Sequence, residues 1–159
     1  MKRLVGCVVC LLSLMTTLSG QKSVDALFEK YSGREGFVTL TLSGDLIKLA
    51  KLDDCEIEGC RFPADIQEIR LLVEDKKGSG GENFYSSVIK DINVRNYEEL
   101  LRVKESDQDI QMLMKTDGNI IRELLLLAGG KDNFVIQLKG NMTMKEARMF
   151  SDDIKRKNE

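Results

Sequence analysis

The chain has 159 residues with no histidine, no tryptophan and a single proline, Pro63. Without histidine it lacks the commonest general base, the commonest zinc ligand and the base of any Ser-His or Cys-His nucleophile pair. No other catalytic arrangement of residues stands out in the sequence. We therefore expect a protein that is not an enzyme and that uses no metal or other cofactor.

A concentration of charge of one sign is also missing. The chain carries 24 lysines and arginines against 26 aspartates and glutamates, a formal net charge of −2, and these residues are scattered along it. A weakly acidic chain without a basic cluster is not expected to bind nucleic acid or an anionic membrane surface. Scattered charges are typical of a solvated surface.

Two segments resemble ligand loops without matching them. In the glycine-rich stretch Lys77–Gly81 the lysine precedes the glycines, whereas a P-loop places it after them. The acidic stretch Asp53–Glu58 lacks the alternating ligands and central glycine of an EF-hand loop. We expect both segments to be surface loops.

The N-terminus has the features of a secretory signal peptide. Lys2 and Arg3 precede an uncharged run from Leu4 to Leu18, which is shorter than the roughly 20 apolar residues of a membrane span. Small residues follow, so we predict a signal peptide over 1–20, cleaved near Gln21. The alternatives are an uncleaved anchor and a lipoprotein, although Gln21 stands where a lipoprotein has cysteine. The mature protein is expected in the periplasm or outside the cell, with no stable membrane span.

Signal cleavage leaves two cysteines, Cys55 and Cys60. In an oxidising compartment they could close a small disulfide ring. Their C-x4-C spacing differs from the C-x-x-C of thiol oxidoreductases. Together they could supply only two ligands of a four-ligand zinc site. A local staple or two unpaired thiols is favoured over a thiol-based enzyme.

Hydrophobic periodicity predicts the elements of the mature chain. A spacing of three and four residues indicates helices, and strict alternation with β-branched residues indicates strands. Helix N-caps are expected at Ser23 and Asn83, which are favoured residue types at that position. Thr143 and Glu146 have the spacing of a capping box. Helices are predicted after these caps and near 45–50, and strands at 37–42, 65–75, 97–104, 110–116, 120–127 and 134–140.

This order predicts an α+β fold in a single domain, residues 21–159. The sheet is expected to be mostly antiparallel, with a C-terminal four-strand meander and with helices packed on one face. Asp117-Gly118 is a hairpin signal within that meander. The segment Ile120–Leu127 has helical propensity, but its place between two turns favours a central strand that is apolar on both faces at its end.

Methionines gather late in the chain, and methionine surfaces can serve adaptable binding. Met112, Met114 and Phe150 are therefore candidates for the lining of an apolar groove between sheet and helix. Ordinary packing in the core is the alternative for all three.

Three blocks of sequence resemble a known family. Ala26–Ser43, Tyr97–Glu105 and Arg122–Met142 are similar, in this order, to a group of small exported Bacteroidetes proteins that share domain of unknown function 4252. The resemblance implies a secreted or envelope location in a Gram-negative bacterium. It implies no activity and no functional residues.

These observations favour a non-catalytic protein-binding or accessory module whose partner is an unidentified envelope protein. The alternative is a periplasmic carrier of a small apolar ligand such as an acyl chain. A thiol-based enzyme is the third hypothesis.

Overall fold

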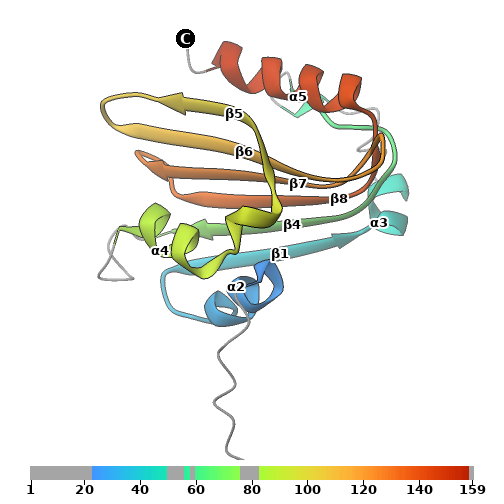
Figure 1. Cartoon of the computed structure of the whole chain (residues 1–159). Coiled ribbons are helices and arrows are strands. Elements are labelled where there is room, and N and C mark those ends of the chain that lie inside the picture. The colour runs from blue at the N-terminus through green and yellow to red at the C-terminus, as the bar shows by residue number, and fades with distance from the viewer. Residues whose placement is uncertain (1–22, 50–55, 58–59, 76–82, 158–159) are drawn as a thin grey trace, which may run out of the picture.

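The computed structural model describes residues 23–49, 56–57, 60–75 and 83–157 (Figure 1). Its main feature is a six-stranded sheet in the order β1-β4-β8-β7-β6-β5, with every neighbouring pair antiparallel. The strands are β1 (Phe37–Ser43), β4 (Ile66–Glu74), β5 (Glu98–Lys104), β6 (Gln108–Asp117), β7 (Ile120–Gly130) and β8 (Phe134–Met142). A separate two-stranded ladder joins β2 (Glu56–Ile57) to β3 (Cys60–Arg61).

The helices are α2 (Val24–Tyr31), α3 (Gly44–Leu49), α4 (Phe84–Asp91), the 3-10 helix η1 (Val94–Asn96) and α5 (Met144–Lys157). The α+β class and the antiparallel meander of β5 to β8 are confirmed. Within the described ranges, no helix combines the length and the apolar character needed to cross a membrane.

The predicted hairpin between β6 and β7 is present, one residue later than expected. Asp117 pairs with Ile120, so the two-residue loop consists of Gly118 and Asn119. Gly118 has a φ of 61°, a left-handed conformation that glycine adopts without a steric penalty.

The helices pack on both faces of the sheet, which corrects the prediction that they share one face. Leu124 and Leu126 of β7 belong to one core cluster, together with Ala147 and Phe150 of α5. Leu125 and Leu127 belong to a second cluster with apolar residues of α2 and α4. Successive side chains of a strand point to opposite faces. A central strand that is apolar on both faces therefore needs a cover on each.

The N-caps lie where the sequence predicts them. The Oγ of Ser23 accepts a hydrogen bond from the backbone N–H of Ala26, and the Oδ1 of Asn83 accepts one from the N–H of Ser86, both at 3.1 Å. At the start of α5, the Thr143 N–H donates to Glu146 Oε2 at 2.8 Å, and the Glu146 N–H donates to Thr143 Oγ1 at 3.2 Å. This reciprocal pair is a capping box.

We expect the capping box to make stability depend on acid pH. The hydrogen bond from the Thr143 hydroxyl is the main cause that lowers the pKa of Glu146 below its ordinary value. A lowered folded-state pKa adds stability above the unfolded value of about 4.3, and this stability is lost as the pH falls through the folded value. Urea unfolding of Glu146→Gln should therefore show a lower midpoint at neutral pH and a smaller loss below about pH 4.

Asp152→Asn, which removes an exposed carboxylate from the same helix, is the matched control for the loss of a charge. An identical acid dependence in Glu146→Gln and the unmodified protein would contradict the assignment.

Helix α4 approaches β7 closely because Gly129 has no side chain. A Cβ atom placed on Gly129 would lie 2.2 Å from the Cβ of Tyr85. The same tyrosine donates its hydroxyl hydrogen to Gln111 Oε1 on β6 at 3.0 Å. Gly129 therefore sets how closely α4 covers this face.

Candidate functional site

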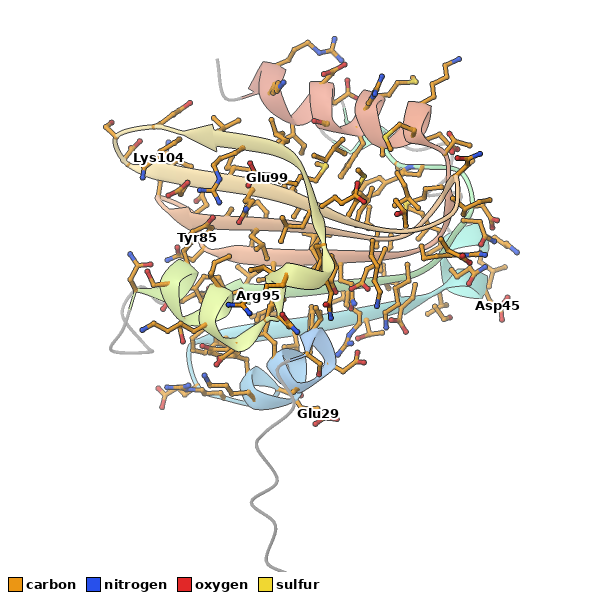
Figure 2. All side chains as sticks on the ribbon, in the orientation of Figure 1. Glu29, Asp45, Tyr85, Arg95, Glu99 and Lys104 are labelled. Atoms are coloured by element: carbon orange, nitrogen blue, oxygen red, sulfur yellow. The ribbon has the colours of Figure 1, made fainter. Side chains whose placement is uncertain are left out.

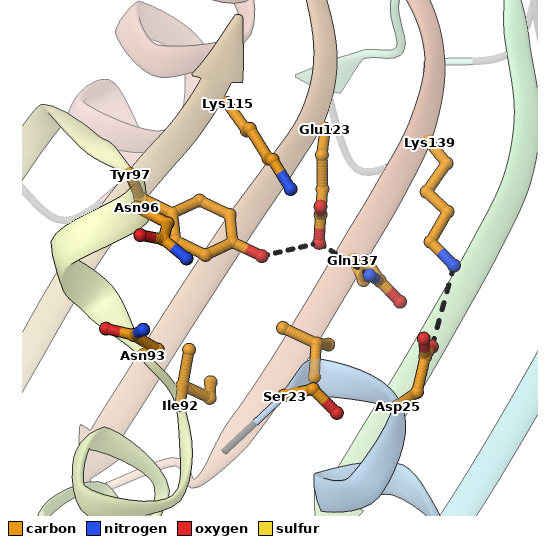
Figure 3. A pocket seen from close by; sticks show the side chains of 11 residues that line it. Ser23, Asp25, Ile92, Asn93, Asn96, Tyr97, Lys115, Glu123, Gln137 and Lys139 are labelled. Atoms are coloured by element: carbon orange, nitrogen blue, oxygen red, sulfur yellow. Dashed lines mark hydrogen bonds and ion pairs between the residues drawn. The ribbon is translucent and has the colours of Figure 1, made fainter. Parts of the chain in front are cut away.

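A polar cavity of about 180 Å³ opens on the face of the sheet that carries α2 and α4 (Figure 3). It lies between the start of α2, the segment around η1 and the strands β6, β7 and β8. Nine of its eleven lining side chains are polar, and only Val24 and Ile92 are apolar. The polar lining consists of Ser23, Asp25, Asn93, Asn96, Tyr97, Lys115, Glu123, Gln137 and Lys139.

Glu123 on β7 is the centre of the cavity wall. Its Oε1 accepts a hydrogen bond from the Tyr97 hydroxyl at 2.9 Å and another from the Gln137 amide at 2.6 Å (Figure 3). Gln137 is 2% exposed, so its amide depends on these protein partners. Glu123 is two residues from Leu125 on β7, and Gln137 is two residues from Val135 on β8. Each polar residue therefore lies on the same face of the sheet as its apolar neighbour.

A chain of ion pairs borders the same cavity. Asp25 Oδ1 lies 2.5 Å from Arg70 Nη1 and 3.6 Å from Lys139 Nζ, and Lys139 also pairs with Glu68 at 3.0 Å. The guanidinium of Arg70 stacks 4.1 Å from the ring centre of Phe28. The pairs link α2 to β4 and β8, although the Asp25 side chain is 68% exposed and exposed pairs stabilise little.

The electrostatics keep Tyr97 protonated. Burial is the main cause that raises the pKa of the Tyr97 phenol far above its ordinary value of 10, and the charge of Glu123 adds to it. Tyr97 is therefore a hydrogen-bond donor and not a base at neutral pH. Lys115 pairs in register with Glu123, and its ammonium group points into the cavity (Figure 3). The cavity could hold a small polar molecule by hydrogen bonds and charge.

A second candidate surface is apolar and lies on the opposite face. Val38 and Leu40 on β1 are 51% and 45% exposed, and they pair with Val73 and Leu71 on β4. We call these four residues the apolar patch. Their neighbours Leu42 and Ile69, which also pair, pack against the core that α5 covers. Alternation therefore places the patch on the α5 face, yet neither core cluster of the described residues includes it.

The residues proposed from the sequence lie elsewhere. Met112, Met114 and Phe150 are 0%, 6% and 2% exposed, and all three belong to the core cluster beneath α5. They pack in the interior and do not line a groove open to solvent. Cys55, the side chain of Cys60 and the predicted signal peptide over 1–20 lie outside the described residues, as do the loop 77–81 and most of the acidic stretch 53–58.

Sequence reasoning missed both candidate surfaces. Glu123 and Gln137 were visible as polar residues within apolar strands, a signal of a polar site on a buried face. The alternation of Val38 and Leu40 indicated an apolar strand face but not whether a helix would cover it. In the described part of the chain, no three His, Cys, Asp or Glu side chains lie close enough together to hold a metal ion.

The model of a family described as Domain of unknown function (DUF4252) matches residues 31–150. No curated protein and no solved structure matches the chain.

Proposed function

The chain belongs to the DUF4252 family, and from this premise we propose that it is a non-catalytic, exported protein-binding module of the bacterial envelope that binds through the apolar patch. One observation carries the proposal. Val38 and Leu40 expose about half of their apolar side chains on an edge strand, beside two further apolar residues of β4. Exposed apolar residues that lie together on a surface are typical of protein interaction sites.

The polar cavity, unlike the apolar patch, is better explained by a structural role than by binding. Glu123, Tyr97 and Gln137 hydrogen-bond to one another, and Arg70 and Lys139 pair with Asp25. These groups find their partners within the protein, so they need no ligand to satisfy them. The patch has no comparable cover among the described residues.

Export is the second part of the proposal, and the predicted signal peptide over 1–20 supports it. A protein that acts in the envelope would find its partner there. Intact mass measurement of the protein recovered from its producing cell should give a chain that begins near Gln21.

We expect changes in the apolar patch to weaken partner binding. In the double variant Leu71→Thr, Val73→Thr the strand propensity is kept while the apolar surface is reduced. Burying one such side chain contributes about 1.5–3 kcal/mol, and about 1.4 kcal/mol corresponds to tenfold in affinity. The envelope protein captured by the unmodified chain at native expression should therefore bind at least about tenfold more weakly, as measured with both proteins purified.

Ile120→Thr is the matched control. Ile120 is an apolar strand residue that is 39% exposed and lies outside the patch. It should leave binding unchanged. Equal affinity in the double variant and the control would contradict the proposal, provided that circular dichroism shows both variants folded.

A further inference from the structure

The two edges of the sheet differ in chemistry. The edge strand β5 carries Glu98, Glu99, Arg102 and Lys104, of which Glu99 and Lys104 are labelled in Figure 2. Its register with β6 shifts between Glu99 and Leu101. The other edge strand, β1, has no charged residue from Phe37 to Ser43, and its seven residues pair with β4 without a shift. Charges and bulges are features that prevent edge strands from pairing with other chains. The β1 edge has neither.

The backbone of β1 presents hydrogen-bonding groups away from the sheet. The Asp75 N–H donates to the Gly36 carbonyl at 2.9 Å. This bond shows that the even-numbered residues of β1 are the ones that hydrogen-bond to β4. In an antiparallel pair, alternate residues bond to the neighbour. Thr39 and Thr41 therefore direct their N–H and C=O groups away from β4, on the side where β1 has no neighbouring strand among the described residues, and Thr41 is exposed.

We propose that β1 pairs antiparallel with β1 of a second copy of this chain, about a two-fold axis at Leu40. The inference goes beyond the proposed function, because it concerns the edge of β1 and a second copy of the chain, whereas the proposed function concerns the apolar patch and an envelope protein. In this register Leu40 faces Leu40, Val38 faces Leu42, and Thr39 faces Thr41. The outward groups of Thr39 in one copy and Thr41 in the other exchange both hydrogen bonds.

The strand is complementary to itself, which favours a second copy over an unrelated strand. From residue 38 to residue 42 the two-fold axis places apolar side chains opposite apolar ones and threonine opposite threonine, while Phe37 lies opposite Ser43 at the strand end. Such cross-strand pairs stabilise a sheet, whereas like charges opposite each other destabilise it, and β1 contains no charge. The two sheets would become one continuous sheet, and the two apolar patches would lie side by side on the same face.

The test is the mass of the purified protein in solution by sedimentation equilibrium. The unmodified protein should have the mass of two chains. Leu40→Lys places two ammonium groups opposite each other and should give the mass of one chain, as should Leu40→Glu. An equimolar mixture of these two variants should recover the mass of two chains, because position 40 of one copy faces position 40 of the other.

A second pair of variants tests the backbone contact. Thr41→Pro removes an N–H that points away from β4 and should at least halve the fraction of paired chains, whereas Thr41→Ala keeps the N–H and should pair normally. Circular dichroism and thermal unfolding of each variant report whether it folds.

Two outcomes would overturn the inference. The first is the mass of one chain for the unmodified protein at submillimolar concentration. The second is the mass of two chains that neither Leu40→Lys nor Thr41→Pro changes, since the copies would then meet elsewhere. Because the Leu71→Thr, Val73→Thr variant leaves β1 unaltered, its loss of an envelope partner would support the proposed function even if the chain is a monomer.

Discussion

Replacing Leu125 with alanine is expected to lower the free energy of unfolding by about 2–5 kcal/mol, and Leu124→Ala by a similar amount. The two leucines are neighbours on β7 and are 0% and 1% exposed. Leu125 packs in the core beneath α2 and α4, and Leu124 packs in the core beneath α5. Each change removes the same atoms and leaves a cavity, one on each face of the sheet.

Urea unfolding measures the two losses, with Ile120→Ala as the control. Ile120 belongs to the same strand and is 39% exposed, so its replacement should have a much smaller effect. A large loss for only one of the two leucines would contradict helix cover on both faces. Amide hydrogen exchange should also separate the variants, with lower protection in α4 for Leu125→Ala and in α5 for Leu124→Ala.

Glu123→Ala is expected to have the second largest effect, a loss of about 1–3 kcal/mol of stability. The change removes the acceptor of the hydrogen bonds from Tyr97 and Gln137. The Gln137 amide is then left in the interior without that partner, and an unsatisfied buried donor is unfavourable. Chemical unfolding at neutral pH gives the size of the loss.

Glu123→Gln is the matched control, since its side-chain oxygen can accept both hydrogen bonds while the charge is lost. It should keep most of the stability. Both variants should lower the pKa of Tyr97 towards its ordinary value, because the charge of Glu123 contributes to the raised pKa. Ultraviolet titration of the phenol measures this shift. If Glu123→Ala is as stable as the unmodified protein, Glu123 does not organise the cavity wall.

Much of the local structure could be predicted from the sequence. The predicted caps at Ser23, Asn83 and Thr143 are confirmed. They could be predicted because each involves a hydrogen bond between residues only three apart in the chain. The strand β7 was predicted correctly against its helical propensity, from the turns on each side of it and from its apolar residues. The family was also identified from the three blocks of sequence.

The candidate surfaces could not be predicted in the same way. The cavity wall joins Tyr97, Glu123 and Gln137, which are 26 and 14 residues apart along the chain. The ion pair between Asp25 and Arg70 spans 45 residues. Met112, Met114 and Phe150 have side chains that suit either a groove or a core, and only the position of α5 decides that they are core.

The sequence by itself determined three of the helix starts, the strand alternation and the antiparallel meander, since these depend on hydrogen bonds and side-chain periods within a few residues. The tertiary structure alone decided which apolar face receives a helix. Val38 and Leu40 alternate like residues of a buried strand, but the described helices cover other parts of the sheet and leave these side chains exposed. Whether an apolar side chain becomes core or surface depends on the packing of distant elements, which periodicity does not encode.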